Sequence, residues 1–181
     1  MRAIDKTERS KQKERGTSRV SEFLSSLDAI ASVTKQSDNR LMIRYGRQDH
    51  TKQILVLTDD GKNEGLFAEV YLTSRPHQSY AIQTKLGELF DGEVDYIFYL
   101  SGQTLFTLPA VKFRYWLDHN TDMLRHECFF ESDNGCEIRH HGYIVPRQKL
   151  RSDFAKGDVR VSIFLFRQNT KTGKTDYIQE I

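Results

Sequence analysis

Carboxylate side chains gather where short apolar runs alternate with turn-forming residues. Asp49 precedes one apolar run, Asp59 and Asp60 follow it, and Glu69 lies inside the next run. Two or more carboxylates can hold Mg²⁺, which takes oxygen ligands, and a nearby base such as lysine can then prepare a water for phosphodiester cleavage. Adjacent strands would bring these side chains together. The alternative is structural, with Asp59 and Asp60 as turn residues and Glu69 facing solvent on a half-buried strand.

Hydrophobic spacing and turn-forming residues predict the elements that would position these carboxylates. In chain order the predicted elements are a helix over 18–35, strands over 41–45, 53–58 and 66–73, a helix over 82–90, strands over 95–100 and 104–108, a short helix begun by Pro109, strands over 125–131 and 136–145, and a strand over 160–166. Turn-forming clusters predict three hairpins, which pair 53–58 with 66–73, 95–100 with 104–108, and 125–131 with 136–145.

The order helix, three strands, helix, strand resembles the core of the PD-(D/E)xK endonuclease superfamily over residues 18–117. The motif of that family places an acidic residue on one strand and Glu-x-Lys on the next. The matching segment here is Glu69-Val70-Tyr71, so a tyrosine stands at the position of the lysine. A phenol has a pKa of about 10, which makes it a poor general base at neutral pH.

The resemblance implies a metal site formed by Asp49, Asp60 and Glu69, with Mg²⁺ as the cofactor if the protein is catalytic. Glu69 would then be both a metal ligand and a catalytic residue. Because Tyr71 replaces the lysine, the base would come from elsewhere. Lys85, in the predicted second helix, is the first candidate for that role.

Histidine and cysteine side chains in the predicted hairpin over 125–145 form a second group with metal-ligand chemistry. A two-residue turn centred on the Asn-Gly pair puts His126, Cys128 and His141 on one face of the hairpin, and Cys136 and His140 on the other. A four-ligand zinc site would therefore need a distant fourth ligand. A disulfide between the two cysteines is disfavoured as well, so we expect free thiols.

Charge is distributed unevenly along the chain. Residues 1–19 hold seven Lys/Arg against three Asp/Glu, residues 20–146 hold twelve against eighteen, and residues 147–174 hold eight against two. Basic side chains beside aromatic ones can hold phosphates and stack on bases. The residues that we predict to contact nucleic acid are Arg147, Lys149, Arg151 and Arg160. The alternative is that these charges only solvate the edges of a core strand.

The length of 181 residues and the hydrophobic content of 38% predict one globular domain over 18–167, preceded by a flexible basic arm over 1–17 and followed by a turn-rich tail over 168–181. The predicted fold is mixed α/β, with a central, mostly antiparallel sheet flanked by helices, and a restriction-endonuclease-like arrangement is one form of it. Apolar runs fall short of the roughly 20 residues that span a membrane, and the first residues lack a secretory signal. We therefore expect a cytoplasmic protein without a membrane span.

The predicted function is that of a DNA-acting protein that resembles metal-dependent PD-(D/E)xK endonucleases, with phosphodiester hydrolysis as the reaction. The alternative is a non-catalytic nucleic-acid-binding or protein-interaction module, and Tyr71 at the lysine position favours it.

Overall fold

A computed structural model describes most of the chain. The described residues are 2–3, 6–46, 50–59, 61–62, 64–77, 81–133, 135–156 and 161–180. Three of the predicted site residues, Asp49, Asp60 and Arg160, lie outside them.

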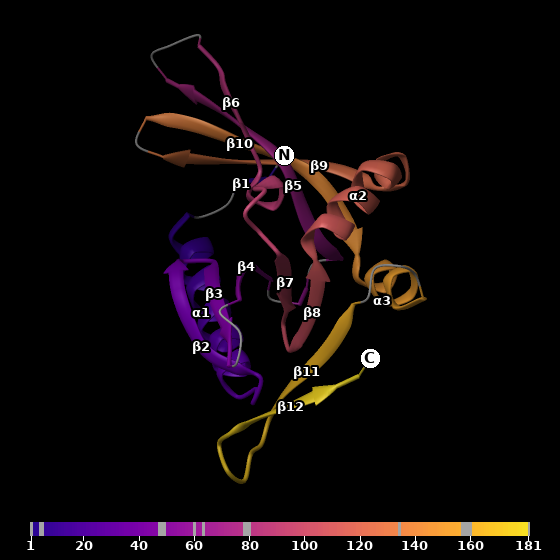
Figure 1. The fold of residues 1–181 in the computed structure, drawn as a ribbon. Helices are drawn as coiled ribbons and strands as arrows, with labels where there is room; N and C mark the ends of the chain where they lie inside the picture. The colour runs from indigo at the N-terminus through magenta and orange to yellow at the C-terminus, as the bar shows by residue number, and fades with distance from the viewer. Residues whose placement is uncertain are drawn as a thin grey trace.

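Strands dominate the described part of the chain (Figure 1). The α-helices are α1 (Lys6–Ser25), α2 (Ala110–Asn120) and α3 (Arg147–Lys156), and the 3-10 turns are η1 (Glu88–Phe90) and η2 (Thr121–Met123). The strands are β1 (Arg2–Ala3), β2 (Ile30–Ser37), β3 (Arg40–Tyr45), β4 (Thr51–Asp59), β5 (Gly65–Pro76), β6 (Gln83–Leu86), β7 (Tyr96–Ser101), β8 (Thr104–Pro109), β9 (Arg125–Asp133), β10 (Cys136–Pro146), β11 (Ser162–Gln168) and β12 (Thr175–Gln179).

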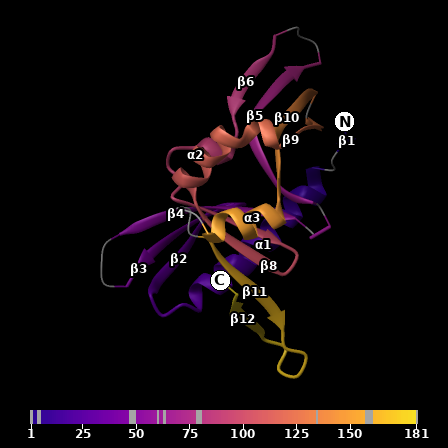
Figure 2. The same cartoon turned by 90° about the vertical axis from the view of Figure 1, so that its right-hand side faces the viewer.

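The strands form two sheets. Sheet A has the order β1-β9-β10-β5-β6, and sheet B has the order β12-β11-β8-β7-β4-β3-β2. Neighbouring strands pair antiparallel, apart from the parallel pairs β1 with β9 and β4 with β7. The predicted mixed α/β class and the mostly antiparallel pairing are confirmed, whereas the prediction of a single central sheet is wrong. The β5–β6 and β11–β12 segments extend from opposite ends of the molecule (Figures 1 and 2).

Helix α1 lies against sheet B. Val20, Phe23 and Leu24 are buried at the i, i+3, i+4 spacing that the sequence predicts for a helix face. The predicted bounds of this helix are wrong at both ends, because the helix begins at Lys6 and ends at Ser25. The segment after it, rich in β-branched side chains, pairs with β3 as β2. The segment expected to be a flexible arm thus contributes the first half of α1, while the division into arm, domain and tail stays a prediction.

Strand β4 shows why the predicted hairpin of β4 with β5 is wrong. Ile54, Leu55 and Val56 are all buried, so the strand is covered on both faces and occupies the middle of sheet B between β3 and β7. The chain then leaves sheet B at Asp59 and enters sheet A at Gly65. The predicted helix over 82–90 is also wrong, because this segment forms β6 and η1.

The two other predicted hairpins and the helix after Pro109 are confirmed, whereas the tail predicted to be turn-rich contains strand β12. Strands β7 and β8 form a hairpin, and α2 begins directly after Pro109. Strands β9 and β10 pair in the predicted register, with Cys128 opposite His141 and His126 opposite Tyr143.

Two groups of buried residues form the core. One group lies around Phe113 of α2 and draws on both sheets, and the other lies between α1 and sheet B. Among the described residues, no helix is long and apolar enough to cross a membrane.

Candidate functional site

Glu69 lies on β5 in a polar cluster that connects sheet A to α1. Its Oε2 is 2.5 Å from His140 Nδ1 and 3.8 Å from Arg9 Nη2. Arg9 Nη1 also lies 3.5 Å from Glu131 Oε2, and His140 Nε2 lies 3.5 Å from Glu131 Oε1. The side chains of Glu69, Glu131 and His140 are 14%, 11% and 7% exposed, so these contacts are largely shielded from water. We call Arg9, Glu69, Glu131 and His140 the latch cluster.

The ring of Phe129 packs against the latch cluster. Phe129 stacks on His140 with ring centroids 4.6 Å apart, and the guanidinium carbon of Arg9 lies 5.0 Å from the Phe129 centroid. The single charge of Arg9 is therefore shared between two carboxylates while its guanidinium also contacts an aromatic face. This arrangement attaches the first half of α1 to sheet A, and the sequence-based expectation that Glu69 faces solvent does not describe it.

A β-bulge separates Glu69 from Tyr71. In the pairing of β5 with β10, His141 faces Tyr71 and the next residue, Gly142, faces Glu69, so Val70 is the extra residue. Consecutive strand residues point to opposite faces, and Glu69 contacts His140 while Tyr71 stacks on His141. Glu69 and Tyr71 therefore lie on opposite faces of sheet A, unlike the first and third positions of an unbroken strand.

Lys85 lies on β6, the edge strand of sheet A, where its side chain is exposed. It pairs with Leu72, which in turn pairs with His140, so Lys85 shares a face with the latch cluster but lies two strands away from His140. Two strand spacings amount to about 10 Å. The structure thus places Lys85 on the same face of sheet A as the latch cluster, on the strand next to the one that carries Glu69.

A small pocket of about 40 Å³ opens beside Glu69, between α1, β4, β5 and η1. Its polar lining consists of Arg9, Lys13, Glu69 and Glu88. Lys13 Nζ lies 3.7 Å from Glu88 Oε2. Sequence reasoning missed Arg9, Lys13 and Glu88, the first two because they lie in the predicted arm. Arg9, Lys13, Gly16 and Val20 follow one another at steps of four, three and four residues, and this spacing was the signal of a helix face.

The latch cluster does not provide a set of free metal ligands. Within the described ranges, no group of three or more His, Cys, Asp or Glu side chains is arranged to hold a metal ion. Glu69 already contacts a guanidinium and an imidazole, and cations at this carboxylate compete with a metal ion. Asp49 and Asp60, the other two predicted ligands, lie outside the described residues, so the Mg²⁺ site that the resemblance implies stays a prediction.

Asp59, at the end of β4, has a structural role in a second polar cluster. It accepts hydrogen bonds from the Tyr99 hydroxyl, from Ser101 Oγ at 2.8 Å and from the backbone N–H of Gly61 at 2.6 Å. Burial and the bond to Asp59 raise the pKa of Tyr99. Arg147 donates to Gly61 O at 2.7 Å and to Ser101 Oγ at 2.8 Å, so it connects two turns at the start of α3.

The other predicted phosphate contacts on α3 are also engaged within the chain. Lys149 Nζ lies 5.7 Å from the Trp116 ring centroid. Arg151 Nη1 lies 3.0 Å from Glu180 Oε2, and its guanidinium carbon lies 5.7 Å from the Phe106 centroid. Arg147, Lys149 and Arg151 thus lie on one helix, and each contacts neighbouring groups within the chain.

The face of sheet A opposite the latch cluster carries a row of rings from three strands. Tyr71 stacks on His141 at 4.5 Å between centroids and 14° between planes. His126 lies 6.1 Å from His141, and its ring meets Tyr143 edge-on at 5.5 Å. Tyr71, at 36% exposure, and His126 are open to solvent. We call the surface made by Tyr71, His126 and His141 the ring face.

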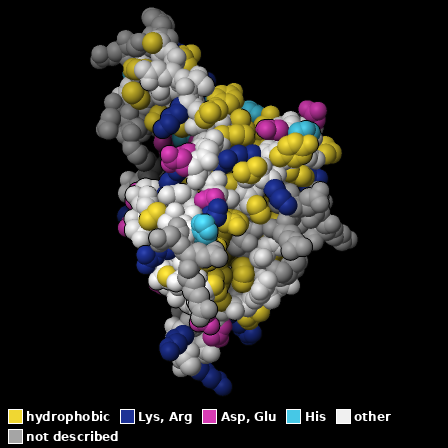
Figure 3. All heavy atoms as spheres, in the orientation of Figure 1, with side chains coloured by type: hydrophobic (Ala, Val, Ile, Leu, Met, Phe, Trp, Pro, Cys, Tyr) yellow, Lys and Arg dark blue, Asp and Glu magenta, His cyan; other side chains and the backbone are white. Residues whose placement is uncertain are grey.

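Arginines flank the ring face. Arg139 lies opposite Thr73 across β5 and β10, and the alternation of side chains puts Arg75 and Arg139 on the same face as Tyr71 and His141. Both arginines are exposed, and Arg139 Nε also lies 2.6 Å from Glu137 Oε1 on the same face. In Figure 3, hydrophobic side chains lie interspersed with basic, acidic and histidine side chains over the upper half of the molecule, where sheet A and α2 lie in Figure 1.

His141 is held neutral on the ring face. Burial lowers its pKa, and the nearby His126 and Arg139 lower it further. Sequence reasoning found His126 and His141 on one face of the hairpin, but it missed Tyr71 because it paired β5 with β4 and not with β10.

Comparison with known proteins finds no matching family model, no matching curated protein and no matching solved structure.

Proposed function

We propose that the protein binds single-stranded DNA without cleaving it, through the ring face of sheet A. The stacked pair of Tyr71 and His141, partly exposed on sheet A and flanked by Arg75 and Arg139, carries the proposal. Every base has a flat π surface, so a row of rings on a sheet can stack successive unpaired bases without reading their sequence. The arginines would then hold the phosphates between them.

The state of His141 supports stacking over ion pairing. Because its pKa is lowered, the imidazole is neutral at pH 7 and does not repel the neighbouring arginines. A duplex hides its bases inside the helix, so a flat ring-bearing sheet favours a single strand over a duplex.

Fluorescence anisotropy with a labelled single-stranded oligonucleotide at low salt tests the proposal. Tyr71→Ala should weaken binding by about 1–3 kcal/mol, which corresponds to roughly 5- to 150-fold in the dissociation constant. Tyr115→Ala is the matched control, because Tyr115 is an exposed tyrosine on α2 at 67% exposure and outside the ring face. Equal affinity of the two variants, or no binding by the unmodified protein, would contradict the proposal.

Salt dependence tests the arginines separately. Each phosphate contact to a single strand contributes about −0.7 to the slope of log affinity against log salt. Arg139→Gln and Arg75→Gln should each reduce the slope by about that amount. Arg151→Gln should leave the slope unchanged if Arg151 pairs with Glu180 and not with a phosphate. A reduced slope in this variant would favour the contacts predicted from the sequence at Arg147, Lys149, Arg151 and Arg160.

Mg²⁺-dependent phosphodiester hydrolysis, expected from the resemblance to the PD-(D/E)xK endonucleases, is the second candidate. Glu69 and Glu88 line one pocket together with Lys13, which supplies the residue types of such a site. The contacts of Glu69 with Arg9 and His140 favour the non-catalytic alternative. Incubation of supercoiled and linear DNA with Mg²⁺ decides between the two: nicking that Glu69→Gln abolishes supports the enzyme, and binding without nicking removes it.

A further inference from the structure

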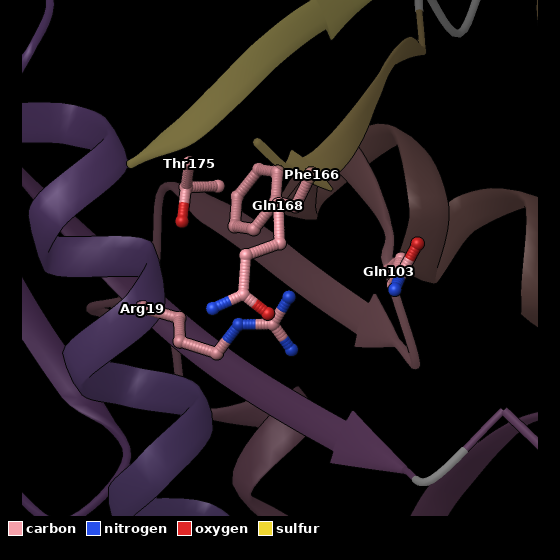
Figure 4. Close-up of a pocket in the computed structure, with 5 residues that line it drawn as sticks. All are labelled: Arg19, Gln103, Phe166, Gln168 and Thr175. Atoms are coloured by element: carbon pink, nitrogen blue, oxygen red, sulfur yellow. The ribbon is translucent and has the colours of Figure 1, made fainter. Parts of the chain in front are cut away.

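A second cavity lies at the opposite end of the molecule from sheet A. It has a volume of about 290 Å³ and is lined by Arg19 of α1, Gln103 of the β7–β8 turn, and Phe166, Gln168 and Thr175 of the β11–β12 hairpin (Figure 4). Three segments far apart in the sequence thus contribute one guanidinium, two carboxamides and one hydroxyl. Among the described residues, none that lines the cavity carries a carboxylate.

Arg19 is oriented before any ligand arrives. Its Nη1 donates to Gly102 O at 2.8 Å, and its guanidinium carbon lies 5.4 Å from the Phe166 ring centroid. A guanidinium has five N–H donors in a rigid fork, so one bond to a carbonyl leaves others for a ligand. In Figure 4 the guanidinium of Arg19 and the carboxamide of Gln168 point toward one another, with Gln103 on the far side.

The turn that carries Gln103 is held in place as well. The backbone N–H of Phe166 donates to Gln103 O at 2.8 Å, which attaches the β7–β8 turn to β11. Gln168 pairs with Thr175 next to the turn of the hairpin. The side chains of the cavity therefore project from backbone segments that hydrogen bonds restrain.

The hairpin beside the cavity is basic. Residues 167–176 contain Arg167, Lys171 and Lys174 against the single carboxylate Asp176. Figure 3 shows Lys or Arg side chains at the lower tip of the molecule, where this hairpin lies in Figure 1. Glu22, near Tyr177, adds one opposing charge from α1. The balance attracts an anion toward Arg19.

We infer that this cavity binds a nucleoside phosphate, with the phosphate on Arg19 and the base near the carboxamides of Gln103 and Gln168. A guanidinium matches the oxygens of a phosphate with two parallel hydrogen bonds. Carboxamides both donate and accept, as the edge of a base does. A volume of about 290 Å³ exceeds what a phosphate alone needs and lies at the lower end of small-ligand cavities.

The same chemistry is offered by a free mononucleotide and by the phosphorylated end of a DNA strand. The inference does not depend on the ring face, because adenosine 5′-monophosphate can be tested alone. Titration followed by calorimetry and by backbone amide NMR shifts should show binding of the monophosphate and at least tenfold weaker binding of adenosine. A 5′-phosphorylated oligonucleotide compared with its 5′-hydroxyl counterpart, both in the Tyr71→Ala protein, identifies the strand end as the source if only the first binds.

Two variants test the assignment of the residues. Arg19→Gln should weaken binding of the monophosphate about tenfold or more, since a charge-assisted bidentate contact is lost. Gln168→Ala should weaken binding of the monophosphate severalfold. Gln168 is exposed, and its side chain makes no hydrogen bond to the described residues, so this variant should fold even if Arg19→Gln does not. Arg15→Gln is the matched control one turn earlier on α1, where the side chain is exposed and outside the cavity. Equal weakening by Arg15→Gln, equal binding of adenosine and its monophosphate, or no binding of either phosphate-bearing probe overturns the inference.

Discussion

At the scale of the residue, one extra amino acid in β5 decides what Glu69 can do. Val70 occupies the bulge, so Glu69 turns toward Arg9 and His140 while Tyr71 turns toward His141. The two ends of the Glu69-Val70-Tyr71 segment therefore make separate contacts on opposite faces of sheet A. The first contact restrains α1, and the second builds the ring face.

Glu69→Gln should therefore destabilise the protein. Loss of the charge leaves Arg9 and His140 with a neutral partner in a shielded site, which costs about 1.5–3 kcal/mol. Urea denaturation followed by circular dichroism measures the change. Glu137→Gln is the control, because the pair of Glu137 with Arg139 is exposed and should be worth less than about 0.5 kcal/mol. A loss of equal size in both variants would mean that the latch cluster contributes no more than a surface ion pair.

The buried Tyr99 hydroxyl should make stability fall at alkaline pH. The pKa of Tyr99 is raised by burial and by its bond to Asp59, so the folded protein keeps this proton where the unfolded chain, with a tyrosine pKa of about 10, has lost it. Stability should then decrease above pH 10 by up to about 1.4 kcal/mol per pH unit.

Tyr99→Phe removes this term, so the difference between the unmodified protein and the variant should shrink from pH 9 to pH 11. Urea midpoints at pH 9, 10 and 11 measure it. Tyr115→Phe, at an exposed position, should keep the slope of the unmodified protein. A constant difference between the Tyr99 variant and the unmodified protein across this range would show that the hydroxyl does not titrate differently on unfolding.

At the scale of the element, α1 is positioned by how closely it approaches β4. A Cβ on Gly16 would lie 2.0 Å from Thr58 Cγ2 and 2.9 Å from Thr58 Cβ, closer than atoms can approach without movement. The neighbouring Thr17 hydroxyl, buried at 1% exposure, donates to Asp38 O at 2.7 Å. Helix α1 at Gly16 therefore packs directly against the Thr58 side chain of β4.

Gly16→Ala should destabilise the protein, although alanine is the better helix former by about 1 kcal/mol. Separation of α1 from β4 should cost about 1–3 kcal/mol in the urea-derived free energy of unfolding. Thr58→Ala removes the nearest atom, so the double variant should recover part of the loss. Gly92→Ala, where no atom lies within 4 Å of the added Cβ, is the control. Stabilisation by Gly16→Ala would show that α1 does not pack at this distance.

At the scale of the whole molecule, a shared core joins the two sheets. Leu66, Ala68 and Val145 of sheet A pack in the same buried group as Leu55 and Phe106 of sheet B. Separation of the two sheets would expose buried apolar side chains of both. The architecture therefore has two sheets and one continuous connection between them.

We expect a single cooperative unfolding transition. Trp116, the only tryptophan in the sequence, packs against the shared core, while far-ultraviolet circular dichroism reports on both sheets. The two signals should change at the same urea concentration within error, as two-state unfolding requires. An earlier transition in one signal would show that the sheets unfold separately.

The sequence by itself determined the local structures whose pattern lies within a short window. Turn-forming residues and alternation predicted the β7–β8 and β9–β10 hairpins, the second with the correct register, and Pro109 predicted the start of α2. That register already placed His126 and His141 on one face. The helical spacing of Val20, Phe23 and Leu24 was equally local and equally correct.

Only the tertiary structure decided which distant strands pair and which charges meet. Strand β5 pairs with β10 and not with β4, because β4 is buried on both faces between β3 and β7 and offers β5 no free edge. This pairing brings Tyr71 to His141, and the bulge brings Glu69 to Arg9. Local propensity contains neither fact, since the free energy that selects a partner strand comes from burial shared with residues far along the chain.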